Sequence, residues 1–305
     1  MRDVFFIVGP TATGKSEVAA DVGHELGAEI VSADAFQIYR GLDLLTAKPD
    51  AATLARVPHH LIGTMSILNE MNAEKFRRVA LQAISEIHSR GKSAIVVGGG
   101  GLYIKALTHG LSAAPGSDSN VRAKLNKLSL EQLRRRLVEI DPESARKIDM
   151  KNRRRVMRAL EICLLSGKAA STQRTGWSAA ETAAATGVFV FRERDELYDR
   201  INRRVEAMFE NGVLEEARNA SAMSETASKM IGLREIRELL DGKMSILQCV
   251  AAIQQATRRY AKRQLTWFRQ QTNFQPLNLS LLSQNEAVKE ISQLARSFGV
   301  AQGND

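Results

Sequence analysis

Short apolar runs separated by amphipathic stretches make up most of the chain. Strand-like runs lie at Val4–Val8, Glu29–Val31, Ser93–Val97 and Gly187–Phe191. Helical periodicity fills the intervals, as at Lys15–Leu26 and Ala73–Arg90. Strands that alternate with helices in this way are typical of a parallel sheet with helices on both faces. The pattern therefore predicts an α/β core.

The pattern changes between Leu111 and about Arg194. After turn residues at 115–118, only helical segments follow, at about Val121–Ile140, Pro142–Ile148 and Asn152–Leu165. From Asp195 onward the chain is mostly helical again, and its longest helical segment runs from about Ile246 to Gln271. We therefore expect one α/β core domain built from residues 1–112 and 195–305, and a mostly helical insertion domain at residues 113–194.

A glycine-rich loop follows the first apolar run and opens the first helical stretch. Its residues are Gly9, Pro10, Thr11, Ala12, Thr13, Gly14, Lys15 and Ser16, which is the pattern of a P-loop. Such a loop presents backbone N–H groups and the positive end of a helix dipole to a diphosphate or triphosphate. Lys15 adds a positive charge, and the Ser16 hydroxyl is a candidate ligand for Mg²⁺. Kinases, NTPases and transferases that release diphosphate all use this loop, so it does not identify the reaction.

The composition is that of an ordinary globular protein. Of its 305 residues 44% are hydrophobic and 25% are charged, and no apolar run approaches the length of a membrane span. The N-terminus passes directly into a strand, so we expect a cytoplasmic protein without a membrane anchor. Cys163 and Cys249 form no metal-binding or disulfide pattern, and we expect both to be packing residues.

The positive charge is concentrated in two stretches. Residues 122–158 contain 13 basic and 5 acidic residues, which is nearly the whole excess behind the chain's net charge of +9. Residues 258–269 are also rich in arginine and lysine and contain no acid. Clustered cations neutralise phosphates and attract polyanions, so the two stretches together indicate nucleic acid as a partner.

Two further elements are expected at the same edge of the sheet as the P-loop. Asp34 follows the second strand-like run, and the glycine-rich element Gly98–Gly101 follows the third. Ligands of open parallel sheets bind at the carboxyl edge of the strands. From its position alone, Asp34 is a candidate magnesium ligand, general base or capping residue.

The ordered motifs resemble those of a known family. The segments GPTATGKS, SADAFQIYRGLDLLTAKP, VPHHLI, VVGGGGLYIKAL, DPESARKIDMKNRRRVMRALE and TRRYAKRQLTWFR are similar to the signature of the tRNA dimethylallyltransferases, also called tRNA isopentenyltransferases. The resemblance runs from about Phe6 to Arg269. It implies transfer of a dimethylallyl group from dimethylallyl diphosphate to the exocyclic amine of the adenosine 3′ of the anticodon in tRNA, with release of diphosphate. Its implied partners are the anticodon stem-loop and the donor, and we expect a monomer.

The resemblance also assigns roles to residues of this chain. It implies that Asp34 is the base that accepts the amine proton, and that the P-loop with Lys15 binds the donor diphosphate. Contacts with the target nucleotide are implied for Asp34, Ala35, Phe36 and Gln37. Contacts with tRNA are implied for Gly100, Arg122, Arg154, Arg155, Val156, Met157 and Arg158.

The chain departs from the family pattern near the expected reaction centre. Gly100 stands where the family usually has a threonine, and Ala35 stands where a serine is usual. Both changes remove a hydroxyl. They leave Lys15, Ser16, Asp34 and Gln37 unchanged, and the expected effects are on the rate of transfer and on the contact with the target phosphate.

Two other functions are compatible with parts of the sequence. A small-molecule or nucleoside kinase would use Asp34 to orient a hydroxyl and the arginine-rich insertion as a lid over ATP. A catalytically idle tRNA-binding relative would follow if the departures at Ala35 and Gly100 abolished transfer. The motifs that follow the P-loop favour the prenyltransferase.

Overall fold

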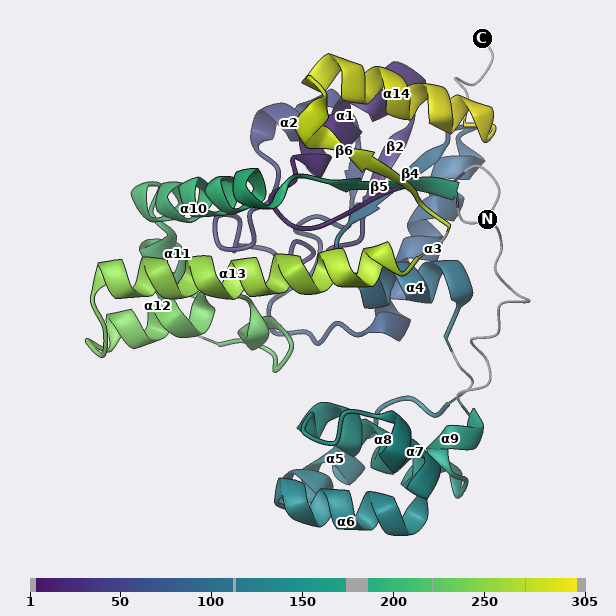
Figure 1. Ribbon diagram of the computed structural model, residues 1–305, viewed down its shortest axis with the longest axis vertical. Coiled ribbons are helices and arrows are strands. Elements are labelled where there is room, and N and C mark those ends of the chain that lie inside the picture. Colours follow the sequence, from purple (N-terminus) through teal and green to yellow (C-terminus); the bar gives the residue numbers. More distant parts are fainter. Residues whose placement is uncertain (1–3, 112–113, 174–185, 221, 272, 301–305) are drawn as a thin grey trace. The chain divides into compact units, whose positions relative to one another are not determined.

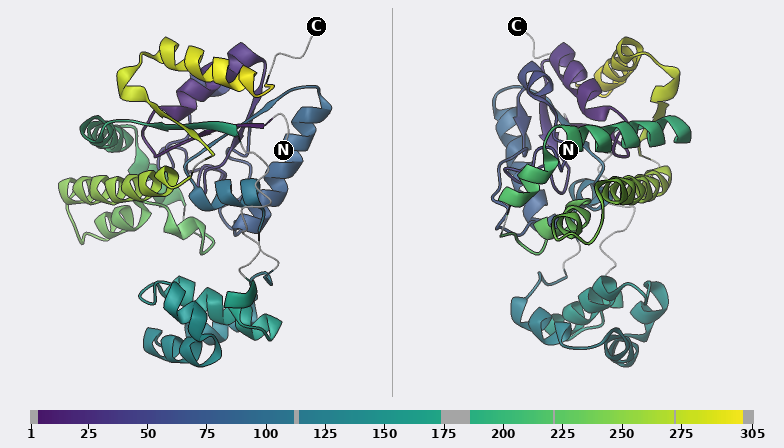
Figure 2. Two further views of the ribbon diagram at one scale, coloured as in Figure 1. Left: turned by 45° about the vertical axis from the view of Figure 1, so that its right-hand side comes forward. Right: turned by 90° about the vertical axis from the view of Figure 1, so that its left-hand side faces the viewer.

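The chain divides into two compact units in the computed structural model. Residues 4–111, 114–173, 186–220, 222–271 and 273–300 are described. One unit lies within residues 1–108 and 183–305, and the other lies within residues 109–182 (Figures 1 and 2). In the part of the chain described here, no helix is both long and apolar enough to cross a membrane.

The larger unit contains a parallel sheet, as the sequence predicts. Its described strands are β1 (Val4–Val8), β2 (Glu29–Ser32), β3 (His59–His60), β4 (Ala94–Gly98), β5 (Thr186–Phe191) and β6 (Gln275–Asn278). They lie in the order β3-β2-β4-β1-β5-β6, and every pair is parallel. The two edge strands, β3 and β6, were not predicted, because they are short and carry no apolar run.

Alternate residues of β1 enter two different cores. Phe5 and Ile7 belong to the core that α1 (Lys15–Leu26) and α14 (Gln284–Ser297) cover. Val4, Phe6 and Val8 belong to the core that contains residues of α3 (Ala73–Ser89) and α4 (Gly101–His109). Figure 1 shows α1 and α14 on one side of the sheet and α3 and α4 on the other. Because the strands are parallel, the loops after β1, β2 and β4 meet at one edge.

The other helices of this unit are α2 (Ala51–Arg56), α10 (Arg194–Glu210), α11 (Val213–Asn219), α12 (Leu233–Leu240) and α13 (Ile246–Arg269), with the short 3₁₀ turns η3 (Ala227–Lys229) and η4 (Leu279–Leu281). The long helices α10 and α13 pack against each other, as Figures 1 and 2 show. Near the end of α13, Phe268 is buried and Trp267 packs beside it. Phe268 is a core residue, and the partly buried Trp267 packs against the same core.

The smaller unit is helical, as predicted. It contains α5 (Ser119–Asn126), α6 (Leu130–Ile140), α7 (Pro142–Lys147), α8 (Arg153–Ser166) and α9 (Ala170–Gln173). Its core includes Leu133, Leu137 and Leu160. The single helix expected at Val121–Ile140 is two helices, because Ser129 forms a capping box with Gln132 and starts α6 there.

The predicted boundary of the insertion at residue 194 needs correction. Residues 186–191 form β5, which pairs with β1 on one side and β6 on the other. This apolar strand therefore belongs to the sheet, and the smaller unit ends earlier in the chain. The segment Ser166–Thr186, which is rich in serine, threonine, alanine and glycine, falls partly at residues 174–185, outside the described residues. Cys163 and Cys249 are both buried, which agrees with packing roles.

Candidate functional site

The P-loop has the backbone that its glycines predict. A Cβ at Gly9 would lie 2.1 Å from the Val190 carbonyl oxygen of β5, so only glycine fits there. Gly14 has φ 88° and begins α1. The Thr13 hydroxyl donates a hydrogen bond to the Pro10 carbonyl at 3.0 Å, and Lys15 Nζ donates another at 3.1 Å. The loop therefore closes on itself at the N-terminus of α1, where an anion is stabilised.

A cavity of about 350 Å³ lies between the P-loop, the segment that follows β2, and α10. Its lining residues include Lys15 and Ser16 of the P-loop, Asp34 and Gln37 after β2, and Arg200 and Arg204 of α10. The structure thus brings together the P-loop and Asp34, which the sequence placed at one edge. It adds two arginines that sequence reasoning missed.

The cations of this cavity influence one another. Burial lowers the pKa of Lys15 to about 8, while Asp34 acts in the opposite direction and Arg204 in the same direction. Burial also lowers the pKa of Arg204 to about 10, again opposed by Asp34 and reinforced by Arg200. The buried Arg204 Nε has no hydrogen-bond partner among the described residues. Crowded and incompletely paired cations of this kind are stabilised by an anion.

Asp34 is held by the chain that follows it. Its Oδ1 accepts hydrogen bonds from the backbone N–H of Phe36 at 2.9 Å and of Gln37 at 3.3 Å. Among the described residues Oδ2 makes no hydrogen bond, so this oxygen is available to accept a proton. The predicted capping role and the predicted role as a base are thus both compatible with the geometry, since each uses a different oxygen.

The side chain of Gln37 is oriented by its neighbours. Its Nε2 donates a hydrogen bond to the Ala47 carbonyl at 2.9 Å, and its Oε1 accepts one from the Ser32 hydroxyl at 3.5 Å. Ala35 and Phe36 are partly buried and pack against the core. Contact of residues 34–37 with a nucleotide stays a prediction, but the segment lines or adjoins the cavity.

Three arginines donate hydrogen bonds to oxygen atoms of the P-loop. Arg192 Nε and Arg200 Nε donate to the Thr13 and Ala12 carbonyls, each at 2.8 Å, and Arg204 Nη2 donates to the Thr11 hydroxyl at 2.8 Å. One feature of the sequence could have indicated that Arg200 and Arg204 act together. They are four residues apart, which places both on one face of a helix.

Gln264 of α13 joins the P-loop to the third glycine-rich loop. Its Oε1 accepts a hydrogen bond from the Thr11 N–H at 3.0 Å, and its Nε2 donates one to the Gly99 carbonyl at 2.8 Å. A Cβ on Gly99 would lie 2.2 Å from that Nε2 and 2.8 Å from the Gly9 backbone carbonyl oxygen, so a larger residue there would displace the amide or the backbone. Gln264 is 5% exposed. Its amide therefore links the two loops in a buried position that sequence reasoning did not single out.

Gly100 lies in a tight place. A Cβ added there would be 3.1 Å from the Ala33 carbonyl oxygen and 3.7 Å from Tyr103 Cβ. The residue that replaces the expected threonine therefore has little room for a larger side chain.

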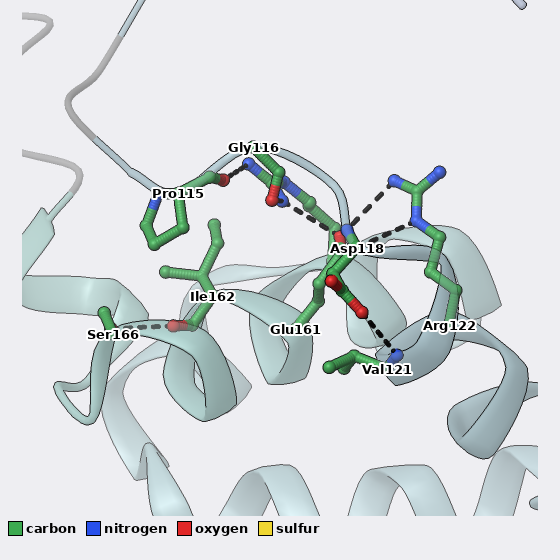
Figure 3. A network of polar contacts seen from close by, with 9 residues as sticks. Pro115, Gly116, Asp118, Val121, Arg122, Glu161, Ile162 and Ser166 are labelled. Carbon is green, nitrogen blue, oxygen red and sulfur yellow. Dashed lines mark hydrogen bonds and ion pairs between the residues drawn. The ribbon is translucent and has the colours of Figure 1, made fainter.

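The predicted tRNA contacts of the smaller unit separate into three groups. Arg154 and Arg155 are exposed on α8. Arg122 and Arg158 are half-buried and form ion pairs with Glu161 (Figure 3). Val156 is fully buried in the core, and Met157 packs against that core. The side chain of Val156 therefore supports the fold, and contact between this position and tRNA stays a prediction.

The P-loop offers a place for Mg²⁺ without a dedicated cage. No cluster of three acidic, histidine or cysteine side chains that could hold a metal occurs among the described residues. Mg²⁺ often binds through one or two protein oxygens together with substrate phosphates. The Ser16 hydroxyl, which lines the cavity beside Lys15, fits that kind of site.

Comparisons with known proteins identify the family. The sequence model of the family described as IPP transferase matches residues 37–271. The chain is 44% identical over 270 residues to tRNA dimethylallyltransferase 1 of Citrifermentans bemidjiense, covering 87% of this chain and 88% of that protein. It is 41% identical over 309 residues to tRNA dimethylallyltransferase of Chlorobium phaeobacteroides, covering 96% and 93%.

Solved structures agree with the sequence comparisons. The tRNA isopentenylpyrophosphate transferase of Bacillus halodurans is similar with a TM-score of 0.74 and 33% identity, covering 98% of this chain and 97% of that one. A eukaryotic dimethylallyltransferase solved while acting on tRNA has a TM-score of 0.77 and 25% identity, covering 91% and 74%. The chain therefore belongs to the IPP transferase family, the family of the tRNA dimethylallyltransferases.

Proposed function

We propose that the chain transfers the dimethylallyl group of dimethylallyl diphosphate to the exocyclic amine of the adenosine 3′ of the anticodon in tRNA, and releases diphosphate. In this reaction a bond forms between the amine nitrogen and the allylic carbon, and the bond from that carbon to the diphosphate oxygen breaks. The enzyme would act as a monomer in the cytoplasm on the anticodon stem-loop. Family membership supports the transfer, and it leaves the kinase alternative without support.

The observation that carries this proposal is the cavity in which a phosphate-binding loop and a carboxylate lie together. Lys15, Ser16, Arg200 and Arg204 line it with Asp34. A site with cations for a leaving diphosphate and one oxygen free to accept a proton suits transfer from an allylic diphosphate to an amine.

The cations act on the leaving group. Negative charge develops on the diphosphate as the allylic bond breaks, and positioned cations stabilise that charge in the transition state. Lys15 and Arg204 are partly buried, so water weakens their interaction with an anion less than it does for exposed cations. Mg²⁺ held by Ser16 and the phosphate oxygens would add positive charge to the same leaving group.

Asp34 acts on the acceptor. The exocyclic amine of adenosine is a poor nucleophile, and a base that accepts its proton assists attack. Oδ1 is fixed by two backbone N–H groups, and Oδ2 takes the proton. The amine of a stacked base cannot reach such a site, so we expect the adenosine to leave its stack.

The test is incubation of the full chain with radiolabelled dimethylallyl diphosphate and tRNA, beside a parallel assay of ATP hydrolysis. We expect label in the tRNA, located to the adenosine 3′ of the anticodon after nuclease digestion. Binding of tRNA without transfer would indicate a catalytically idle tRNA-binding protein. Phosphoryl transfer from ATP to a small molecule would support the kinase alternative. Omission of Mg²⁺ from the same assay tests whether transfer requires this metal ion.

A further inference from the structure

Glu161 of α8 is a buried carboxylate shared by two arginines. It is 1% exposed. Its Oε1 accepts hydrogen bonds from the Asp118 N–H and from Arg122 Nε, both at 2.9 Å. Its Oε2 accepts from Arg158 Nη1 at 2.9 Å and from Arg122 Nη2 at 3.3 Å. Three of these four hydrogen bonds come from the two guanidinium groups and fix both beside the carboxylate (Figure 3).

The two arginines still present charge to solvent. The side chains of Arg122 and Arg158 are 42% and 36% exposed, although Glu161 is buried beneath them. Arg158 Nη2 also donates to the Pro115 carbonyl at 2.5 Å, which holds the segment before α5 against α8. The exposed Arg154 and Arg155 lie one turn earlier on α8. Glu161 therefore organises the cations of a surface that is positive overall.

We propose that Glu161 is a positioning residue for tRNA, which holds Arg122 and Arg158 in the arrangement that meets the RNA phosphates. Its negative charge offsets the repulsion between the two guanidinium groups that share this site. Fixed arginines lose less side-chain freedom on binding than arginines that must first be ordered. The proposal rests on the proposed function, because tRNA must be the substrate that these arginines meet.

Simple charge counting predicts the opposite effect of removing Glu161. The Glu161→Gln substitution makes the smaller unit one charge more positive, and a more positive surface attracts a polyanion more strongly. If Glu161 positions the two arginines, the substitution should instead weaken tRNA binding, because the arginines are no longer held in place. The sign of the change in affinity therefore separates the two explanations.

The experiment measures binding of the anticodon stem-loop to the full chain and to Glu161→Gln. We expect the Kd to rise about tenfold, because two arginine side chains must be ordered on binding. The matched control is Glu139→Gln, which removes an exposed carboxylate of the same unit and should leave the Kd unchanged or slightly lower. A single-stranded RNA of equal length carries the same negative charge, but its phosphates have no fixed arrangement. It should bind Glu161→Gln as tightly as it binds the wild type. Equal or tighter stem-loop binding by Glu161→Gln overturns the proposal.

A second variant tests the same proposal in case Glu161→Gln does not fold. Arg122→Lys keeps the charge and leaves Glu161 bonded to Arg158 and Asp118, but it removes the paired hydrogen bonds of the guanidinium. We expect several-fold weaker stem-loop binding with an unchanged melting temperature and an unchanged KM for the donor. The exposed Arg136→Lys is its control. If Arg122→Lys binds the stem-loop as its control does, the proposal fails, whereas failure of the wild type to modify tRNA would reject the proposed function itself.

Discussion

At the scale of single residues, the candidate site depends on charges that are close together. Asp34 raises the pKa of Lys15 and of Arg204, while burial lowers both. Each cation is therefore easier to deprotonate than in water, and an anionic ligand would stabilise the protonated forms. The carboxylate and the cations have separate tasks in the proposed reaction, and substitutions should separate them.

Asp34→Ala should lower the rate of transfer by roughly 10²–10⁴-fold, the range typical of a lost general base. Donor affinity should change little, because the P-loop and the arginines remain. Single-turnover transfer with labelled donor measures the rate, and equilibrium binding of the donor serves as the control. A rate near that of the wild type would remove Asp34 from the role of base.

Donor affinity should fall as the pH rises above about 8. The pKa of Lys15 in the free protein is about 8, so the ammonium is charged below that pH and progressively neutral above it. A phosphate group completes its ionisation near pH 6, so the donor itself does not titrate in this range. Affinity should be level below pH 8 and decline by up to about tenfold per pH unit above it.

Lys15→Met provides the comparison for this pH dependence. The variant should bind the donor weakly, and its donor affinity should not decline between pH 8 and 9.5. Isothermal titration calorimetry across this range measures both proteins. Parallel pH profiles would assign the titration to another group.

Gly100→Thr should leave the activity equal or lower, although it restores the residue that the family pattern expects. A Cβ would lie 3.1 Å from the Ala33 carbonyl oxygen, which must move to admit it. Ala33 directly precedes Asp34, so such a movement would disturb the base. Steady-state kinetics measures the outcome, with Gly100→Ala as the smaller step. A faster Gly100→Thr enzyme would show that the missing hydroxyl limits this chain.

At the scale of elements, two helices from the C-terminal half hold the P-loop in place. Arg200 and Arg204 of α10 bind its carbonyl and hydroxyl groups, and Gln264 of α13 binds its Thr11 N–H. The same Gln264 binds Gly99 in the loop after β4. The packing of α10 on α13 therefore sets how the two glycine-rich loops lie relative to each other.

Gln264→Ala should lower kcat by about tenfold or more, because misplacement of positioned groups slows a reaction strongly. It leaves the Thr11 N–H and the Gly99 carbonyl without this partner, which also costs about 1–3 kcal/mol of stability. Steady-state kinetics and thermal unfolding measure the two effects. Gln255→Ala, on an exposed position of the same helix, is the matched control. If both variants have the same kcat, the link has no catalytic role.

At the scale of the whole molecule, positive charge and chemistry are distributed over two units. The cavity lies in the larger unit, and the exposed Arg154 and Arg155 lie in the smaller one. Arg158 differs from these two, because it is tied to Glu161 and Pro115. Arg154 and Arg155 are therefore the arginines of α8 whose removal tests tRNA binding without disturbing the core.

Replacing Arg154 and Arg155 together by alanine should weaken tRNA binding and lower the slope of log affinity against log salt by about 1–2, as expected for one or two lost phosphate contacts. Donor binding should not change. Fluorescence anisotropy at several salt concentrations measures the slope. A double alanine variant at the exposed Arg146 and Lys147 removes the same charge from the same unit. Equal slopes for the two double variants would mean that general charge, and not contact, drives binding.

Local sequence determined the features that depend on neighbouring residues. The apolar runs at Val4–Val8 and Ser93–Val97 became central strands, and the glycine pattern of the P-loop produced its turn before α1. Asp34 lies at the predicted edge, since parallel strands end together. The concentration of arginine and lysine in the insertion was also visible, because it needs only a count along the chain.

Tertiary structure decided which distant residues complete the site. Arg200 and Gln264 meet the P-loop across 188 and 253 residues of sequence, and no periodicity within either helix indicates that partner. It also separated Arg155, which is exposed, from Val156, which is buried, within one basic motif. Backbone propensity acts over a few residues, whereas hydrogen bonding and burial depend on which surfaces pack together. The elements were therefore predictable from the sequence, and the residues that hold the two glycine-rich loops in place were not.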